Sequence, residues 1–245
     1  TAGIRQEVRQ RGKYEYLIAA SLYALLAVLF TYPQITIFSQ GFAVSPVGSS
    51  TDFNIVMWDA WWIKKALLDL KTNPFFTQYL FYPNGASLAL HELTLLNSLL
   101  TVPFQLVMDK PAGIILGSNI AILLTFIIAG TGMFALTKYL VRNSVIAFFA
   151  GAAFAFCPYR TMHIVHTDLL SMGWMPLYTL LLFLILRENR MRYPILGALV
   201  FAATMFTCTV YAYFLILLTG FFLVYAVAFE RESLLHPKSA RKFLL

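Results

Sequence analysis

Four ionisable side chains lie close together in residues 157–170, CPYRTMHIVHTDLL, within a chain that is 60% hydrophobic and only 12% charged. They are Arg160, His163, His166 and Asp168. If this segment is helical, His163 and His166 share one face at spacing i, i+3, and Arg160 lies one turn earlier on that face. A guanidinium can bind a phosphate through two hydrogen bonds, and imidazolium adds charge-assisted donors. This spacing therefore favours an anion-binding site.

Two other interpretations of the same cluster stay open. The side chains could anchor a membrane span and donate hydrogen bonds to backbone carbonyls left free near Pro158. The cluster could also be part of a divalent metal site, although an HxxH pair alone is a short motif. The candidate ligands are then His163, His166 and Asp168, with His91 or Glu92 as a further donor.

Other candidate residues lie outside this cluster. Asp52 ends the run SSTD, where it is either the N-cap of the next helix or a general base held where a loop meets the membrane. His91 and Glu92 end an aromatic loop, where they either cap the following helix or contact a substrate. Tyr211 lies in a tight turn between two apolar segments and is either an interface aromatic or a further site contact.

Long apolar segments indicate the elements that must position these residues. The mean hydropathy is +0.73, and apolar runs of about 20 residues recur along the chain, which is typical of an all-α polytopic membrane protein. Residues 193–229 are too long for one crossing, so we expect two helices that meet near TCTVYAY. We predict one membrane domain, 1–245, with about six spans: a first span in 14–39, a large outer loop in 40–111, five further spans in 112–229, and a tail in 230–245.

The distribution of Lys and Arg predicts the orientation. If residues 93–108 are interfacial or re-entrant, most of the 18 Lys and Arg residues fall on one side of the membrane. The positive-inside rule then places both termini in the cytoplasm and all the candidate site residues on the other side. Cytoplasmic flanks explain the net charge of +7, so no nucleic-acid partner is expected.

The outer loop and the third span bear on the site. Tryptophan beside lysine in WDAWWIKK favours an interfacial helix within the loop. Residues 144–157 give about 21 Å of helix, less than the roughly 30 Å of the hydrocarbon layer. The cluster that begins at Arg160 should therefore lie below the outer headgroups, in a cavity that opens at the outer leaflet. Cys157 and Cys208 are expected to be free, buried thiols.

Several motifs in order carry a family resemblance. They are WDAWWIKKALLDL, NPFF, FYPNGASLALHE and FAFCPYRTMHIVHTDLLSMGWMPLY. Together they resemble the bacterial and archaeal polytopic membrane proteins grouped with GT-C-type glycosyltransferases. The resemblance covers roughly residues 15–230, and its most specific part is the pairing of FYPNG with PYRTMHIVHTDLLSMGW.

The resemblance implies an inverting glycosyltransferase of the prokaryotic plasma membrane, which moves a sugar from a polyprenyl-phosphate donor to an acceptor outside the cytoplasm. Asp52 matches the acidic residue of the first outer loop that acts as catalytic base in this family. Arg160, with His163 or His166, would hold the lipid phosphate. Candidate contacts to acceptor or donor are His91, Glu92, Asp168 and Tyr211.

The alternative is a protein of another class, a non-catalytic accessory subunit of a larger membrane complex that keeps the GT-C scaffold. Many family members carry paired acidic residues in the first outer loop and have more spans, whereas Asp52 stands alone beside Thr51 and Phe53. The expected partners are a polyprenyl-phosphate-linked sugar and membrane lipid for the enzyme, and other membrane subunits for the alternative. The sequence does not establish a cofactor, and a divalent metal ion bound by the candidate ligands stays an open alternative.

Overall fold

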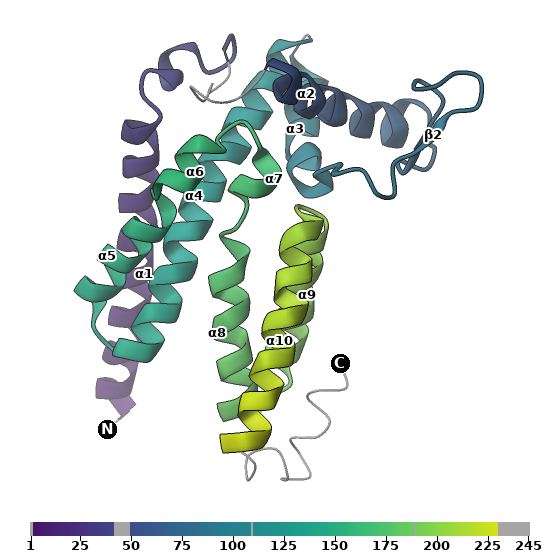
Figure 1. The fold of residues 1–245 in the computed structure, drawn as a ribbon. Helices are drawn as coiled ribbons and strands as arrows, with labels where there is room; N and C mark the ends of the chain where they lie inside the picture. Colours follow the sequence, from purple (N-terminus) through teal and green to yellow (C-terminus); the bar gives the residue numbers. More distant parts are fainter. Residues whose placement is uncertain (1, 42–49, 109, 189, 230–245) are drawn as a thin grey trace.

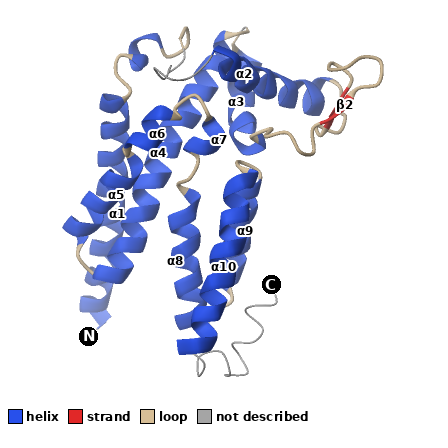
Figure 2. Ribbon diagram, in the orientation of Figure 1, coloured by secondary structure: helices blue, strands red, loops and turns tan. Residues whose placement is uncertain are grey.

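The computed structural model describes residues 2–41, 50–108, 110–188 and 190–229; for residues 2–13 and 50–52 it describes the backbone alone. Almost every element is a helix (Figure 2). Within the described ranges, the sheet consists of two antiparallel strands of two residues each. The elements are α1 (Ala2–Phe30), η1 (Gln34–Ile37), α2 (Ser50–Lys64), η2 (Lys65–Asp69), β1 (Phe76–Thr77), β2 (Ala86–Ser87), α3 (Leu95–Val107), α4 (Ala112–Val141), α5 (Ser144–Ala155), α6 (Pro158–Met162), α7 (Thr167–Leu170), α8 (Trp174–Arg187), α9 (Arg192–Met205) and α10 (Thr209–Phe229).

The longer helices run side by side, and the outer-loop elements gather at one end of them (Figure 1). α1 begins and α10 ends at the other end. α2 lies across the bundle and packs against α3, and α3 packs against α4. The outer loop therefore covers the end of the bundle at which the short helices α6 and α7 also lie.

Four segments are long and apolar enough to cross a membrane, which confirms an all-α membrane protein. They are Ala112–Val141, Ser144–Met162, Thr167–Arg187 and Thr209–Phe229. Tyr14–Phe30 and α9 are shorter apolar helices at the positions of the two other predicted spans. α3 is also apolar, and its 13 residues give about 20 Å of helix, less than a hydrocarbon layer needs.

Two predicted helix boundaries are confirmed. The long apolar segment divides where α9 ends at Met205 and α10 begins at Thr209, within the predicted turn region. The helix of the third span also breaks where predicted, because α5 stops at Ala155 and Pro158 begins α6 at its first turn, whereas the apolar segment itself runs on to Met162. Proline has no backbone N–H and fixes φ, so it starts a helix readily and does not continue one.

Residues 157–170 do not form the single helix that would align Arg160 with both histidines. α6 ends at Met162, His163 is its C-cap, and α7 begins only at Thr167. A turn hydrogen bond from the His166 N–H to the His163 carbonyl, 3.0 Å long, lies between the two short helices. The arrangement of this cluster is therefore set by tertiary contacts rather than by helical spacing.

Tyr23 lies at the packing centre of α1, α4 and α5. Its fully buried ring stacks on Phe148 with centroids 5.1 Å apart, and its hydroxyl donates a 2.9 Å hydrogen bond to the Phe148 carbonyl. Gly130 in α4 and Gly151 in α5 lie directly against this tyrosine. A Cβ at Gly130 would lie 2.6 Å from the tyrosine ring, so the missing side chains let the three helices approach closely.

Gly151→Ala is expected to lower the unfolding free energy by about 2 kcal/mol, as overpacking of a close helix contact does. The new methyl would overlap the Tyr23 hydroxyl and lie 2.6 Å from the Gly130 carbonyl oxygen, which belongs to backbone and cannot swing away. Gly220→Ala in α10 is the matched control, because its Cβ would meet no atom within 4 Å. Thermal unfolding in detergent compares the two variants, and equal midpoints would contradict the packing assignment.

Candidate functional site

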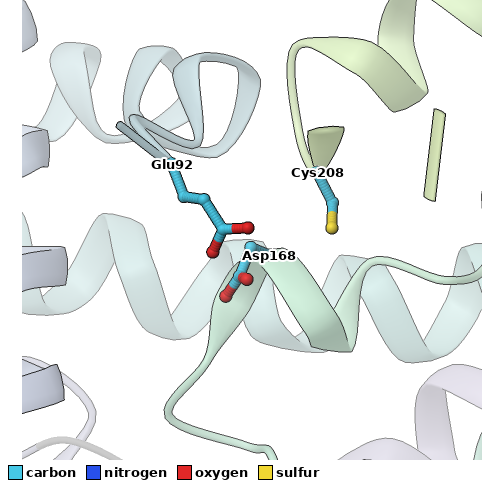
Figure 3. A group of neighbouring side chains, drawn as sticks. All are labelled: Glu92, Asp168 and Cys208. Atoms are coloured by element: carbon cyan, nitrogen blue, oxygen red, sulfur yellow. The ribbon is translucent and has the colours of Figure 1, made fainter. Parts of the chain in front are cut away.

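A group of acidic and thiol side chains lies at the end of the bundle covered by the outer loop. Glu92 precedes α3, Asp168 lies in α7, and Cys208 lies in the turn between α9 and α10. One potential ligand atom from each lies within 4.8 Å of the others (Figure 3). Asp168 and Cys208 are buried, whereas Glu92 is exposed. Three segments far apart in the sequence thus bring carboxyl and thiol groups to one place.

α3 holds these three segments together. The Asn97 side-chain amide donates to the Thr167 carbonyl at 3.1 Å and to the Ser171 hydroxyl at 3.2 Å, which fixes α7. The Leu96 N–H donates to the Phe206 carbonyl at 3.1 Å, which fixes the turn before Cys208. Because buried polar groups are costly without partners, these hydrogen bonds specify the arrangement.

The aromatic outer loop positions Glu92. Trp62 in α2 is fully buried, and its indole N–H donates to the Pro74 carbonyl at 2.8 Å. It packs in one apolar cluster with Leu88 and Leu93, which flank the residues that lead into α3. The tryptophans predicted to lie at the membrane surface therefore also form the core that holds this loop.

Glu92 has a carboxyl group whose pKa is raised to near neutral pH. A hydrogen bond with Asp168, partial desolvation and the negative charge of Asp168 raise the pKa of Glu92 to about 7, against a smaller opposing effect of His91. Two carboxyl groups this close bind one proton between them more readily than either would alone. Near neutral pH the pair can therefore accept or release a proton.

Asp59 and His91 form a second ionisable pair beside the first. His91 Nε2 lies 2.8 Å from Oδ1 of Asp59, whose side chain is buried in α2. The hydrogen bond to Asp59 raises the pKa of His91, and burial raises the pKa of Asp59. The charge of Asp168 also raises the pKa of Asp59, which couples the two pairs electrostatically. We call Asp59, His91, Glu92 and Asp168 the acidic centre.

Glu92, Asp168 and Cys208 could hold a divalent cation. Carboxylate and thiolate donors suit zinc, and three protein donors leave a coordination position for a substrate or water. The ligand set His163, His166 and Asp168 that the sequence suggested is not brought together. Within the described ranges, the donor group around Asp168 includes neither histidine.

Arg160 points into the protein rather than toward a surface. It is completely buried, and its guanidinium donates to the Leu170 carbonyl at 2.5 Å and to the Thr125 hydroxyl at 3.2 Å. The guanidinium also lies over the Phe126 ring, 4.7 Å from its centroid. Its Nε is buried without a hydrogen-bond partner among the described residues. In this conformation a lipid phosphate does not reach the guanidinium.

His163 and His166 lie nearer to the surface than Arg160. Both are partly buried, and their ring centroids are 5.8 Å apart. His163 Nδ1 lies 2.8 Å from the Tyr159 carbonyl, and its ring packs 4.3 Å from the Tyr159 ring. The two imidazoles thus lie near one another, while Arg160 faces another way.

Tyr211 and Asp52 have different places. The buried Tyr211 hydroxyl donates a 2.6 Å hydrogen bond to the Leu169 carbonyl and lies 3.2 Å from the Tyr159 hydroxyl. It therefore links α10 to α7. Asp52 lies in the first turn of α2, and its side chain is outside the described part of the chain. The same helix carries Asp59 about two turns later.

Sequence reasoning missed two members of this region. Asp59 is not among the site residues predicted from the sequence, yet it is fully buried beside His91. An aspartate between tryptophans was the available signal, because a buried carboxylate in an aromatic cluster needs a partner. Cys208 is the free, buried thiol that was expected, whereas Cys157 is free but only partly buried; no pattern linked Cys208 to Glu92 or Asp168.

Comparison of the chain with protein-family models, with curated proteins and with solved structures found no match.

Proposed function

We propose that this protein is a membrane glycosyltransferase of GT-C type, which transfers a sugar from a polyprenyl-phosphate donor to an acceptor on the non-cytoplasmic side. The observation that carries the proposal is the Glu92–Asp168 pair. Its carboxyl groups lie close together at the end of the bundle where the outer loop lies, and the pKa of Glu92 is raised to about 7. A base with a pKa near the working pH is well suited to general base catalysis.

The proposed reaction is a single displacement at the anomeric carbon of the donor sugar. The acceptor oxygen forms a bond to this carbon while the bond from the carbon to the phosphate oxygen breaks. The electron pair leaves with the polyprenyl phosphate, and the acceptor proton passes to the ionised Glu92–Asp168 pair. Attack opposite the leaving group inverts the anomeric configuration. Asp52, the base that the family resemblance assigns, is the second candidate for accepting this proton.

The leaving phosphate carries negative charge, so nearby cations should stabilise the transition state. His163 and His166 are the proposed contacts, because their rings lie close together and remain partly accessible. Arg160 contributes positive charge from the interior instead of a direct contact, since its side chain is fully buried. These roles differ from the prediction from sequence, in which the Arg160 guanidinium binds the lipid phosphate directly.

Release of polyprenyl phosphate from reconstituted protein tests the proposal. Undecaprenyl phosphate carrying a radiolabelled hexose is offered with a panel of hydroxyl acceptors, and free undecaprenyl phosphate is measured. Glu92→Gln is expected to reduce turnover at least about 100-fold, the usual contribution of a general base. Glu188→Gln is the matched control, because Glu188 is the C-cap of α8 at the opposite end of the bundle and accepts a hydrogen bond from Tyr193.

The outcomes separate the candidates. Loss of turnover in Asp52→Asn with normal turnover in Glu92→Gln would move the role of base to Asp52. Wild-type turnover in both variants would overturn the acid–base assignment. Failure of the wild-type protein with every donor, together with stoichiometric co-purification of another membrane protein, would support the accessory-subunit alternative.

A further inference from the structure

An open cavity lies at the end of the bundle away from the acidic centre. It has a volume of about 620 Å³ and lies between α1, α4 and α8. α4 ends at Val141 and α8 ends at Arg187, so the cavity lies by the last turns of both helices. None of the residues of the acidic centre lines it.

Three cationic side chains line this cavity, namely Lys138, Arg142 and Arg187. Glu15 pairs with Lys138 and also accepts a 2.8 Å hydrogen bond from the Ser144 hydroxyl. Glu15 and Ser144 line a different hollow, so the carboxylate approaches Lys138 from outside this cavity. Among the described residues, the cavity wall contains cations and no acidic side chain.

Arg142 and Arg187 are not neutralised by carboxylates. Both are exposed, and neither forms an ion pair with an acidic side chain in the part of the chain that the structure describes. The acidic residue next in sequence, Glu188, lies 3.6 Å from the Arg190 Nε and accepts a hydrogen bond from Tyr193. An anion in the cavity would therefore meet two unpaired guanidinium groups.

The lining changes from polar to apolar with depth. Along α8 the lining residues are Leu180, Leu184 and then Arg187, so apolar side chains lie deeper than the cation at the helix end. The rings of Tyr16 and Tyr139 also line the cavity, and tyrosine is enriched where hydrocarbon meets headgroups. This order matches a phospholipid, whose phosphate lies above its acyl chains.

We propose that this cavity binds the phosphate group of an anionic glycerophospholipid. The recognised chemistry is a phosphoryl anion held by Arg142 and Arg187, with Lys138 beside it. Basic pockets between membrane helices bind such headgroups because charge attraction and fork-shaped guanidinium donors act together. The site is separate from the proposed transferase chemistry and does not depend on it.

Lipid binding to delipidated protein tests this site. Phosphatidylglycerol and phosphatidylcholine with the same acyl chains are added in detergent, and bound lipid is counted by native mass spectrometry. The wild-type protein should retain phosphatidylglycerol in preference to phosphatidylcholine. Arg142→Gln and Arg187→Gln should each weaken phosphatidylglycerol binding about fivefold, the effect of one basic residue at a lipid surface.

Arg190→Gln is the matched control, because it removes a positive charge near the end of α8 without lining the cavity. Equal retention of the two lipids by the wild-type protein would overturn the proposal, as would equal losses in Arg190→Gln and Arg187→Gln. A separate arm adds inorganic phosphate before the lipid. If millimolar phosphate prevents phosphatidylglycerol from binding, the cavity is assigned to a free phosphate ion. Unchanged phosphatidylglycerol binding supports the lipid.

Discussion

Arg160→Ala is expected to lower the free energy of unfolding by about 3 kcal/mol, the scale for leaving buried hydrogen-bonding groups without their donor and opening a cavity. Three effects act together. The Leu170 carbonyl loses a donor at 2.5 Å, the Thr125 hydroxyl loses a contact at 3.2 Å, and the Phe126 ring loses the cation that covers it. Arg160 is also among the largest fully buried side chains, so its removal leaves a cavity.

Thermal unfolding in detergent and size-exclusion chromatography measure this effect. Arg160→Met is the volume-matched control, because it fills most of the space without restoring the hydrogen bonds. It should be less destabilised than Arg160→Ala and more destabilised than wild type. A midpoint for Arg160→Ala within error of wild type would show that the guanidinium is not a structural element, and a direct role in phosphate binding would regain support.

The second large effect concerns the pH dependence of sugar transfer. The pKa of Glu92 is raised to about 7, and a general base acts in its ionised form. Because the ionised fraction grows as pH rises through this value, transfer should increase about tenfold per pH unit well below pH 7 and level off above it. The rate of undecaprenyl phosphate release, measured between about pH 5 and 9, gives this pH profile.

Asp168→Asn provides the diagnostic change in this profile. Asp168 raises the pKa of Glu92 both through a hydrogen bond and through its charge. An asparagine removes the charge and can donate to the ionised carboxylate, so the rising limb should move to lower pH. Asp69→Asn in the same outer loop removes an exposed carboxylate paired with Lys64, and it should leave the limb in place. An unchanged limb in Asp168→Asn would contradict the coupling of Glu92 to Asp168.

Features that depend on local composition were predictable from the sequence. Apolar runs identified the membrane segments, and the excess length of residues 193–229 predicted the break that the structure places between Met205 and Thr209. The break after α5 also followed from sequence, because Pro158 disfavours continuation of α5 and readily begins another helix. These features are set by hydrocarbon thickness and backbone chemistry, which act within a few turns of a helix.

Features that depend on packing between distant segments were not predictable in the same way. Helical spacing suggested that Arg160 and the two histidines share a face, but hydrogen bonds to Leu170 and Thr125 turn the guanidinium inward. No periodicity could indicate that Glu92 would meet Cys208, because their approach requires α3 to bond with the turn after α9.

The sequence by itself determined that this chain is an all-α membrane protein, that helices break near Pro158 and before Thr209, and which stretches carry ionisable groups. Only the tertiary structure decided that Asp59 pairs with His91 and that Glu92 lies beside Asp168. The physical reason is that hydropathy and helix termination are local properties of the chain. Burial and partner choice are set jointly by α2, α3, α7 and the turn before α10, which meet only after the bundle has packed.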